Sequence, residues 1–288
     1  MDKNNEIKKL IETFHSEYTR NGEPIRINFR EIVTELSSTE RYSHLIHSYP
    51  AKLLCHIPYF FLQTDYFCPE NGVVLDPFCG TGTVMLEANI SGRNAKGADA
   101  NPLACLISKV KTTYIKKEYL QKTLGTIISR AKRFNTNEFM DTSSVSRWFS
   151  KSTISQLWHL ECAIKKVRDT KQQDFFMMCL SNLVKKVSFA DPSISVPVKL
   201  NPERFAQNPE RMESAKFKLK TLENIYVYDK FENICQLNIN RIESLKDVYS
   251  NGITSEIISN DARLLTKEFG GTEILQDESV DLILTSPP

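Results

Sequence analysis

Two acids and one hydroxyl residue stand where side chains of an α/β protein can do chemistry, each at the end of a strand-like run. Asp76 opens a glycine-rich turn, Asp99 follows 23 residues later, and Ser286 lies near the last residue of the sequence. An acid after the second strand of a nucleotide-binding unit accepts hydrogen bonds from ribose hydroxyls. The spacing therefore predicts a site for a ligand that contains a nucleoside.

The turn after Asp76 has the composition of a ligand-binding loop without a cation. Its two glycines allow the backbone to bend sharply and to approach a ligand closely. A phosphate-binding Walker loop carries a Lys, whereas this turn has no Lys or Arg, and an acid beside it would repel a pyrophosphate. We therefore expect a zwitterionic, adenosine-containing ligand with an ammonium or sulfonium group rather than ATP. The turn consists of Pro77, Phe78, Cys79, Gly80, Thr81, Gly82 and Thr83.

These residues need elements that bring them to one edge of a sheet. The pattern predicts a strand over 73–76, a helix over 84–91 that Gly92 closes, and a second strand over 94–98. This order is the opening of a nucleotide-type βαβ unit. Strand-like sequence returns at 256–260 and at 280–285. We therefore predict an α/β fold whose chemistry lies at the carboxyl ends of parallel strands.

Two segments resemble motifs of the exocyclic-amino DNA methyltransferases. The segment 76–83, followed by Gly-Ala-Asp-Ala-Asn-Pro at 97–102, resembles their S-adenosylmethionine loop. The segment 281–288 ends in Thr-Ser-Pro-Pro and looks like their catalytic motif, in the form commonest among enzymes of cytosine N4. The resemblance spans 49–113 and 256–288. It implies a class I, Rossmann-like methyltransferase core, S-adenosyl-L-methionine as the cofactor and duplex DNA as the substrate.

The resemblance also implies roles for single residues. Ser286, Pro287 and Pro288 would be catalytic: the Ser286 side chain and a carbonyl of the Pro-Pro segment accept the N–H bonds of the target amine and draw it out of conjugation. The base would first be flipped out of the duplex, and no metal is needed. The implied cofactor-binding residues are Tyr49, Pro50, Asp76, Pro77, Phe78, Cys79, Gly80, Thr81, Gly82, Thr83, Asp99, Ala100, Asn101, Asp261 and Ala262.

Other functions remain open on the sequence. Adenine N6 is an alternative target, because some adenine enzymes share Thr-Ser-Pro-Pro. A cytosine-C5 enzyme is disfavoured, because it needs a Pro-Cys nucleophile and the sequence has no Pro-Cys pair. An RNA methyltransferase uses similar loops, and a catalytically inactive DNA-binding remnant would keep the same fold.

The amino-acid composition is typical of an ordinary globular protein. The sequence has 288 residues, of which 41% are hydrophobic and 25% charged. Seven cysteines without a Cys-x-x-Cys pair indicate reduced thiols and a cytoplasmic location. No apolar run is long enough to span a bilayer, so we expect no membrane partner. Residues 105–255 hold 25 Lys and Arg against 15 Asp and Glu, an excess of basic residues that favours a nucleic-acid-binding insert.

We expect four segments. They are an N-terminal helical arm at 1–48, a cofactor-binding half at 49–113, a helical basic insert for target recognition at 114–254, and a return to the core at 255–288. Helices are predicted over about 154–167, 175–187, 212–228 and 231–249, with a proline-rich loop at 189–198. Lys185, Lys186 and Lys199 are candidates for phosphate contacts.

The sequence stops before the aromatic residue that would follow Pro288 in the resembling family. We therefore expect either a truncated enzyme or one polypeptide of a split enzyme, with a second polypeptide that supplies the remaining strands. The strand at 280–285 would then be an exposed apolar edge. The resemblance also points to a restriction–modification system with a cognate restriction endonuclease as a partner.

Overall fold

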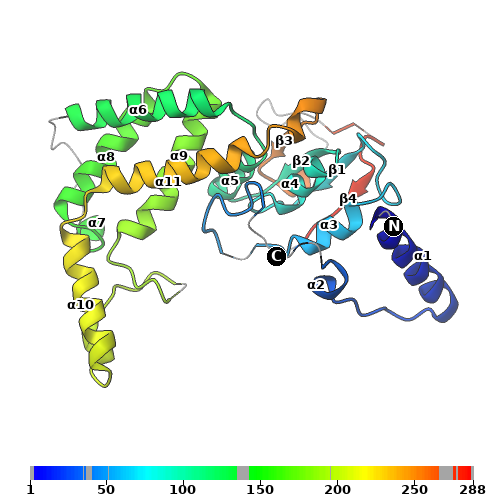
Figure 1. The fold of residues 1–288 in the computed structure, drawn as a ribbon, viewed down its shortest axis with the longest axis horizontal. Helices are drawn as coiled ribbons and strands as arrows, with labels where there is room; N and C mark the ends of the chain where they lie inside the picture. The colour runs from blue at the N-terminus through cyan, green and yellow to red at the C-terminus, as the bar shows by residue number, and fades with distance from the viewer. Residues whose placement is uncertain are drawn as a thin grey trace. The chain divides into compact units, whose positions relative to one another are not determined.

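The chain forms two compact units, residues 1–114 with 244–288 and residues 115–243, each treated separately below (Figure 1). The structure, a computed structural model, describes residues 3–34, 36, 41–50, 52–134, 143–194, 196–265, 275–276 and 278–286.

The first unit is built on a parallel sheet. Its strands are β1 (Val73–Asp76), β2 (Asn94–Ala98), β3 (Ser255–Ser259) and β4 (Leu282–Ile283), in the order β3-β2-β1-β4. All neighbouring pairs are parallel, so the carboxyl ends of the strands meet at one edge (Figure 1). The predicted α/β fold with a parallel sheet is confirmed.

Two helices follow the first two strands, and the sequence predicted the first of them. Helix α4 (Thr83–Ile90) packs on β1 and β2, and seven of its eight side chains are buried. Helix α5 (Pro102–Lys111) contacts β3. It begins at Pro102 because the Asn101 side chain accepts a hydrogen bond from the backbone N–H of Leu103 and proline fits the first helical position.

The N-terminal helices pack on the same unit through a small apolar cluster. They are α1 (Lys3–Asn21), α2 (Phe29–Ile32) and α3 (His56–Leu62). Ile7 and Ile11 of α1 meet Val33, Cys55 and Phe60 in this cluster. The helical pattern of the arm therefore serves packing.

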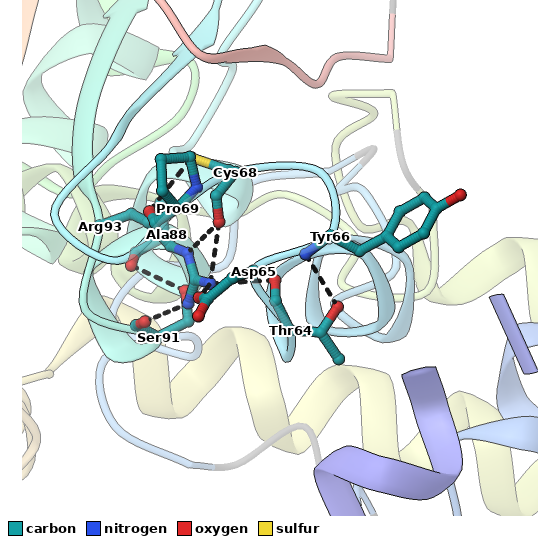
Figure 2. A network of polar contacts seen from close by, with 8 residues as sticks. All are labelled: Thr64, Asp65, Tyr66, Cys68, Pro69, Ala88, Ser91 and Arg93. Carbon is teal, nitrogen blue, oxygen red and sulfur yellow. Dashed lines mark hydrogen bonds and ion pairs between the residues drawn. The ribbon is translucent and has the colours of Figure 1, made fainter. Parts of the chain in front are cut away.

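A buried arginine joins the segment before β1 to the turn after α4. Arg93 is 4% exposed, and its guanidinium donates to the carbonyl oxygens of Thr64, Cys68 and Ser91 and pairs with Asp65 (Figure 2). Arginine suits this position because its five N–H donors can serve several carbonyls at once. The network lies at the amino end of β2, opposite the edge that carries Asp76 and Asp99.

The second unit is a helical bundle. Helices α6 (Lys117–Arg133), α8 (Lys151–Lys165), α9 (Thr170–Val187) and α11 (Val227–Glu243) pack on one another, with α7 (Ser143–Ser146), η1 (Pro202–Phe205) and α10 (Pro209–Glu223) at their connections. Its core includes Phe175, Phe176 and Phe231. Among the described helices, none has both the length and the apolar composition needed to cross a bilayer.

Two predicted helix ends were wrong. The helix predicted over 212–228 ends at Glu223, with Asn224 at its C-cap, and Tyr228 belongs to the next helix. The helix predicted over 231–249 ends at Glu243. Tyr249 lies instead in η2 (Val248–Asn251), where its hydroxyl donates to Asn89 Oδ1 of α4 at 2.6 Å.

The last strand is shorter than the predicted 280–285. Strand β4 consists of Leu282 and Ile283, with backbone hydrogen bonds to β1 from Asp281 and Leu284 on either side. It is the outer strand of the described sheet, and Ile283 is 62% exposed. Its register is fixed by Asp281, whose backbone N–H donates to Val73 O at 3.0 Å and whose carboxylate accepts from Val73 N at 2.7 Å.

We predict that Arg93→Met lowers the free energy of unfolding by about 2–4 kcal/mol, because the buried carbonyl oxygens around it lose their donor. Urea unfolding measures this change. Arg26→Met, at an exposed position of the same unit, is the control and should change stability little. Equal effects of the two substitutions would contradict the structural role of Arg93.

Candidate functional site

Two carboxylates hold the glycine-rich turn at the carboxyl ends of β1 and β2. Asp76 Oδ1 accepts hydrogen bonds from the Phe78 N–H at 3.2 Å and from the Thr285 hydroxyl at 2.7 Å. Asp99 Oδ2 accepts from Gly80 N–H at 2.8 Å, and its Oδ1 accepts from Asn101 N–H at 2.8 Å. Each carboxylate oxygen has further acceptor capacity, so Asp99 can still accept from ribose hydroxyls.

Glycine is required in the turn for two different reasons. Gly82 has φ +72°, and a Cβ there would lie 2.3 Å from Ser108 Oγ of α5. Gly80 has φ +50° and faces open space, where a ligand can approach its backbone. Thr81 and Thr83 flank Gly82 and are buried, and Thr83 is the first residue of α4.

The electrostatics of the turn favour a cationic group. Burial raises the pKa of Asp76 to about 6, the hydrogen bonds from Thr285 and Phe78 oppose this, and nearby Asp99 raises it further. Between Asp76 and Asp99 the sequence has two basic residues, Arg93 in the turn before β2 and Lys96 on β2. Neither belongs to the glycine-rich turn. A sulfonium or ammonium placed beside Asp76 would stabilise its charged form.

The two middle residues of the turn have different environments. Phe78 is 42% exposed, whereas Cys79 is buried and its N–H donates to Ala98 O at 2.9 Å. Burial, with a smaller effect of Asp76, raises the pKa of the Cys79 thiol. A thiol of this kind is a poor nucleophile, so Cys79 shapes the turn and does not react. Pro77, between Asp76 and Phe78, is half-buried.

The segment before the turn reaches the same edge of the sheet. The Asn101 side-chain amide donates to the Tyr49 hydroxyl at 2.9 Å. Pro50 follows Tyr49 in the sequence and Ala100 precedes Asn101, and both side chains are exposed. The structure thus brings Tyr49 together with Asp99 and Asn101, as a cofactor site needs, while the roles of these residues stay predictions.

Asp261 follows β3, the third strand to reach this edge. Its carboxylate accepts from the backbone N–H and the guanidinium of Arg263, and these hydrogen bonds lower the pKa of Asp261 to about 2. Ala262 begins the short helix η3 (Ala262–Leu264). The predicted contact of Asp261 with adenine stays a prediction.

The segment after β4, which was predicted to be catalytic, is joined to the turn by a contact that the sequence did not reveal. Thr285 precedes Ser286, and its hydroxyl donates to Asp76 209 residues away. Ser286 is exposed after β4, whereas Pro287 and Pro288 lie outside the described residues. The Thr of Thr-Ser-Pro-Pro was the available signal, because a hydroxyl at the end of a strand can reach an acid on the neighbouring strand.

Buried charges beneath the turn were also missed. Glu87 of α4 and Lys111 of α5 are 1% and 0% exposed. The sequence signal for both residues was a charged side chain within an otherwise apolar helix. In the described ranges, no cluster of three or more His, Cys, Asp or Glu side chains is arranged to hold a metal ion.

Comparison with known proteins finds DNA methyltransferases. Residues 19–110 match the family model described as DNA methylase. The chain is 26% identical over 266 residues to the type II methyltransferase M.MvaI of Kocuria varians, covering 88% of this chain and 54% of that protein. These matches support the exocyclic-amino DNA methyltransferase family, and the parallel sheet has the Rossmann-like, class I methyltransferase fold.

A second relative matches a shorter part of the chain. The type II methyltransferase M.MjaII of Methanocaldococcus jannaschii is 32% identical over 104 residues, which cover 35% of this chain and 19% of that protein. The chain therefore spans about half the length of M.MvaI and less of M.MjaII. No solved structure matches the chain.

We predict that Asp76→Asn raises the free energy of unfolding by about 1–3 kcal/mol at pH 7.5. The folded pKa of Asp76, about 6, lies above its ordinary 3.8, so burial of the charged form destabilises the protein as pH rises through this interval. The gain should vanish below the ordinary pKa, where both states are protonated. Urea unfolding across this range measures it.

Glu23→Gln, at an exposed position of the same unit, is the charge-matched control and should change stability little. A constant difference between Asp76→Asn and wild type across the pH range would contradict the account of Asp76.

Proposed function

We propose that this chain carries the cofactor-binding part and the start of the catalytic motif of an S-adenosyl-L-methionine-dependent DNA methyltransferase. The observation that carries the proposal is the turn at the ends of β1 and β2. Its backbone is held by Asp76 and Asp99, it has no cation of its own, and Thr285 ties it to the catalytic segment. A site of this charge suits a sulfonium-bearing nucleoside better than a nucleotide.

Each residue of the site would have its own role. Asp99 would accept hydrogen bonds from the ribose, the backbone of the turn would lie along the ligand, and Asp76 would face its cationic side. The cofactor, when bound, supplies an electrophilic methyl group. Ser286 would accept an N–H bond of the target amine, which makes the nitrogen lone pair available. Thr285, bonded to Asp76, would hold Ser286 at the edge of the cofactor turn.

The target that we propose is cytosine N4 in duplex DNA, rather than adenine N6. The Thr-Ser-Pro-Pro form of the motif supports this choice. A target base must leave the stack to meet the cofactor, so we expect base flipping. All seven cysteines are free thiols, which supports a cytoplasmic location.

We further propose that β4 pairs with another strand in the complete enzyme. In the described sheet β4 is the outer strand, and the chain spans 54% of the length of M.MvaI. The added strand would come from the same polypeptide or from a second one. A cognate restriction endonuclease would be a functional partner of such an enzyme.

The second unit supports DNA as the substrate. Arg147, Lys199 and Arg204 line one hollow together with Asn201. Lys199 is placed there by an antiparallel bridge to Ala190, and its ammonium lies 5.3 Å from the centre of the Phe189 ring. Three cations around one hollow can neutralise backbone phosphates. Lys185 and Lys186 are exposed on the last turn of α9, and their phosphate contacts stay predictions.

Calorimetric titration with S-adenosylmethionine tests the cofactor assignment. We expect Asp99→Ala and Asp76→Ala each to weaken binding about tenfold or more, because each removes an acceptor that holds the turn or the ligand. Asp247→Ala is the control and should bind as wild type does. Wild-type affinity in both site variants would place the cofactor elsewhere.

DNA binding tests the second unit. Changing Arg147, Lys199 and Arg204 to Gln together should reduce the slope of log affinity against log salt by about 2–3, because each phosphate that a cation neutralises adds about 0.9 to that slope. The control changes Lys122, Arg168 and Lys171, which are exposed near the amino end of α9, to Gln. An equal reduction of the slope in both triple variants would contradict a specific phosphate site, and tighter binding of tRNA than of duplex DNA would contradict the DNA assignment.

A further inference from the structure

The proline-rich loop after α9 in the second unit is anchored at its base. Its two limbs, 189–191 and 198–200, are joined as an antiparallel bridge by two backbone hydrogen bonds of 2.8 Å. One limb begins at Phe189 and the other ends at Leu200, and both of these side chains are buried. Paired limbs and buried ends restrict the shapes that this loop can adopt.

A buried acid fixes the turn that follows the first limb. Asp191 is 3% exposed, and its Oδ1 accepts hydrogen bonds from the Ser193 N–H at 2.9 Å and from the Ser193 hydroxyl at 2.6 Å. Pro192 and Pro197 add further restriction, because the proline ring fixes the φ angle of the backbone. The loop therefore presents its exposed residues in a preorganised arrangement.

The second half of the loop exposes three adjacent apolar residues. Val196 is 65% exposed and Val198 is 38% exposed, and Pro197 between them is also exposed. We call these three residues the apolar tip. Contact with an apolar surface of another molecule would be favourable, because it removes apolar area from water.

The apolar tip adjoins the hollow that Arg147, Lys199 and Arg204 line. Val198 is itself a lining residue of this hollow, which has a volume of about 480 Å³. Arg204 Nη1 lies 4.0 Å from Asp191 Oδ2, so this acid balances part of the positive charge. Lys199 is exposed and follows Val198 directly in the chain. A partner that fits both features has anionic groups on its outside and apolar faces within reach of them.

We propose that the apolar tip inserts between neighbouring base pairs of the bound DNA and kinks the duplex. The inference rests on the proposed function, which gives DNA as the substrate. Duplex DNA carries phosphates on its outside and stacked, apolar base faces inside, so it matches the cations and the tip together. DNA-bending proteins insert apolar side chains between base steps and kink the duplex by about 20–90°.

The side chains of the tip suit insertion. The side chains of Val196 and Val198 are β-branched and have few rotamers, and the ring of Pro197 is rigid. Such side chains lose little conformational entropy when they are buried. The cations of the hollow would hold the phosphates beside the inserted residues.

Fluorescence energy transfer between the two ends of a labelled duplex measures the kink. Wild type should raise the transfer efficiency, because a kink brings the two ends closer together. The double variant Val196→Ser with Val198→Ser should leave the efficiency at the value of free DNA and weaken binding about tenfold. Its slope of log affinity against log salt should equal that of wild type, because Arg147, Lys199 and Arg204 are retained.

Two further variants separate insertion from a structural role. Val184→Ser is the matched control, because Val184 lies in the same unit and has the same exposure of 38% as Val198. It should bind and kink DNA as wild type does. Val196→Leu with Val198→Leu keeps an apolar tip and should retain the kink. The double Ser variant should unfold at the same temperature as wild type, because both valines are exposed.

Three results would overturn the inference. They are a wild type that binds duplex DNA without a kink, a kink that persists in the double Ser variant, and a loss of thermal stability in that variant. Each of them leaves the proposed function standing. A folded wild type that binds no duplex DNA at low salt would overturn the inference together with the proposed DNA substrate.

Discussion

The hydrogen bonds from the backbone of the glycine-rich turn to Asp76 and Asp99 are the constraint on which the site depends. Asp99 reaches back from the end of β2 to Gly80, and Asp76 bonds to Phe78 within the turn. These bonds fix a loop that Gly82 allows to lie against Ser108 of α5. The backbone beside Gly80 is left facing open space, where a ligand can approach.

Charges of both signs lie close to the same turn. Asp76 and Asp99 stand at the strand ends, and Asp76 is buried, while the buried Lys111 lies near Thr81. The Thr285 bond makes the position of the segment that carries Ser286 depend on Asp76.

Much of the fold followed from local sequence, whereas the contacts that complete the site did not. Strands β1 and β2 and helix α4 were predicted because their apolar runs are bounded by Asp76, Gly82 and Gly92 in one short stretch. The bond between Thr285 and Asp76 depends on the register of two strands far apart in sequence. Helix ends at Glu223 and Glu243 were missed because the apolar periodicity continues past them.

A crystal structure of the chain with S-adenosylhomocysteine would test the central claim most directly. The account predicts ribose hydroxyls on the Asp99 carboxylate and the backbone of Gly80 along the ligand. A ligand bound with its ribose away from Asp99, or in another part of the chain, would contradict the account.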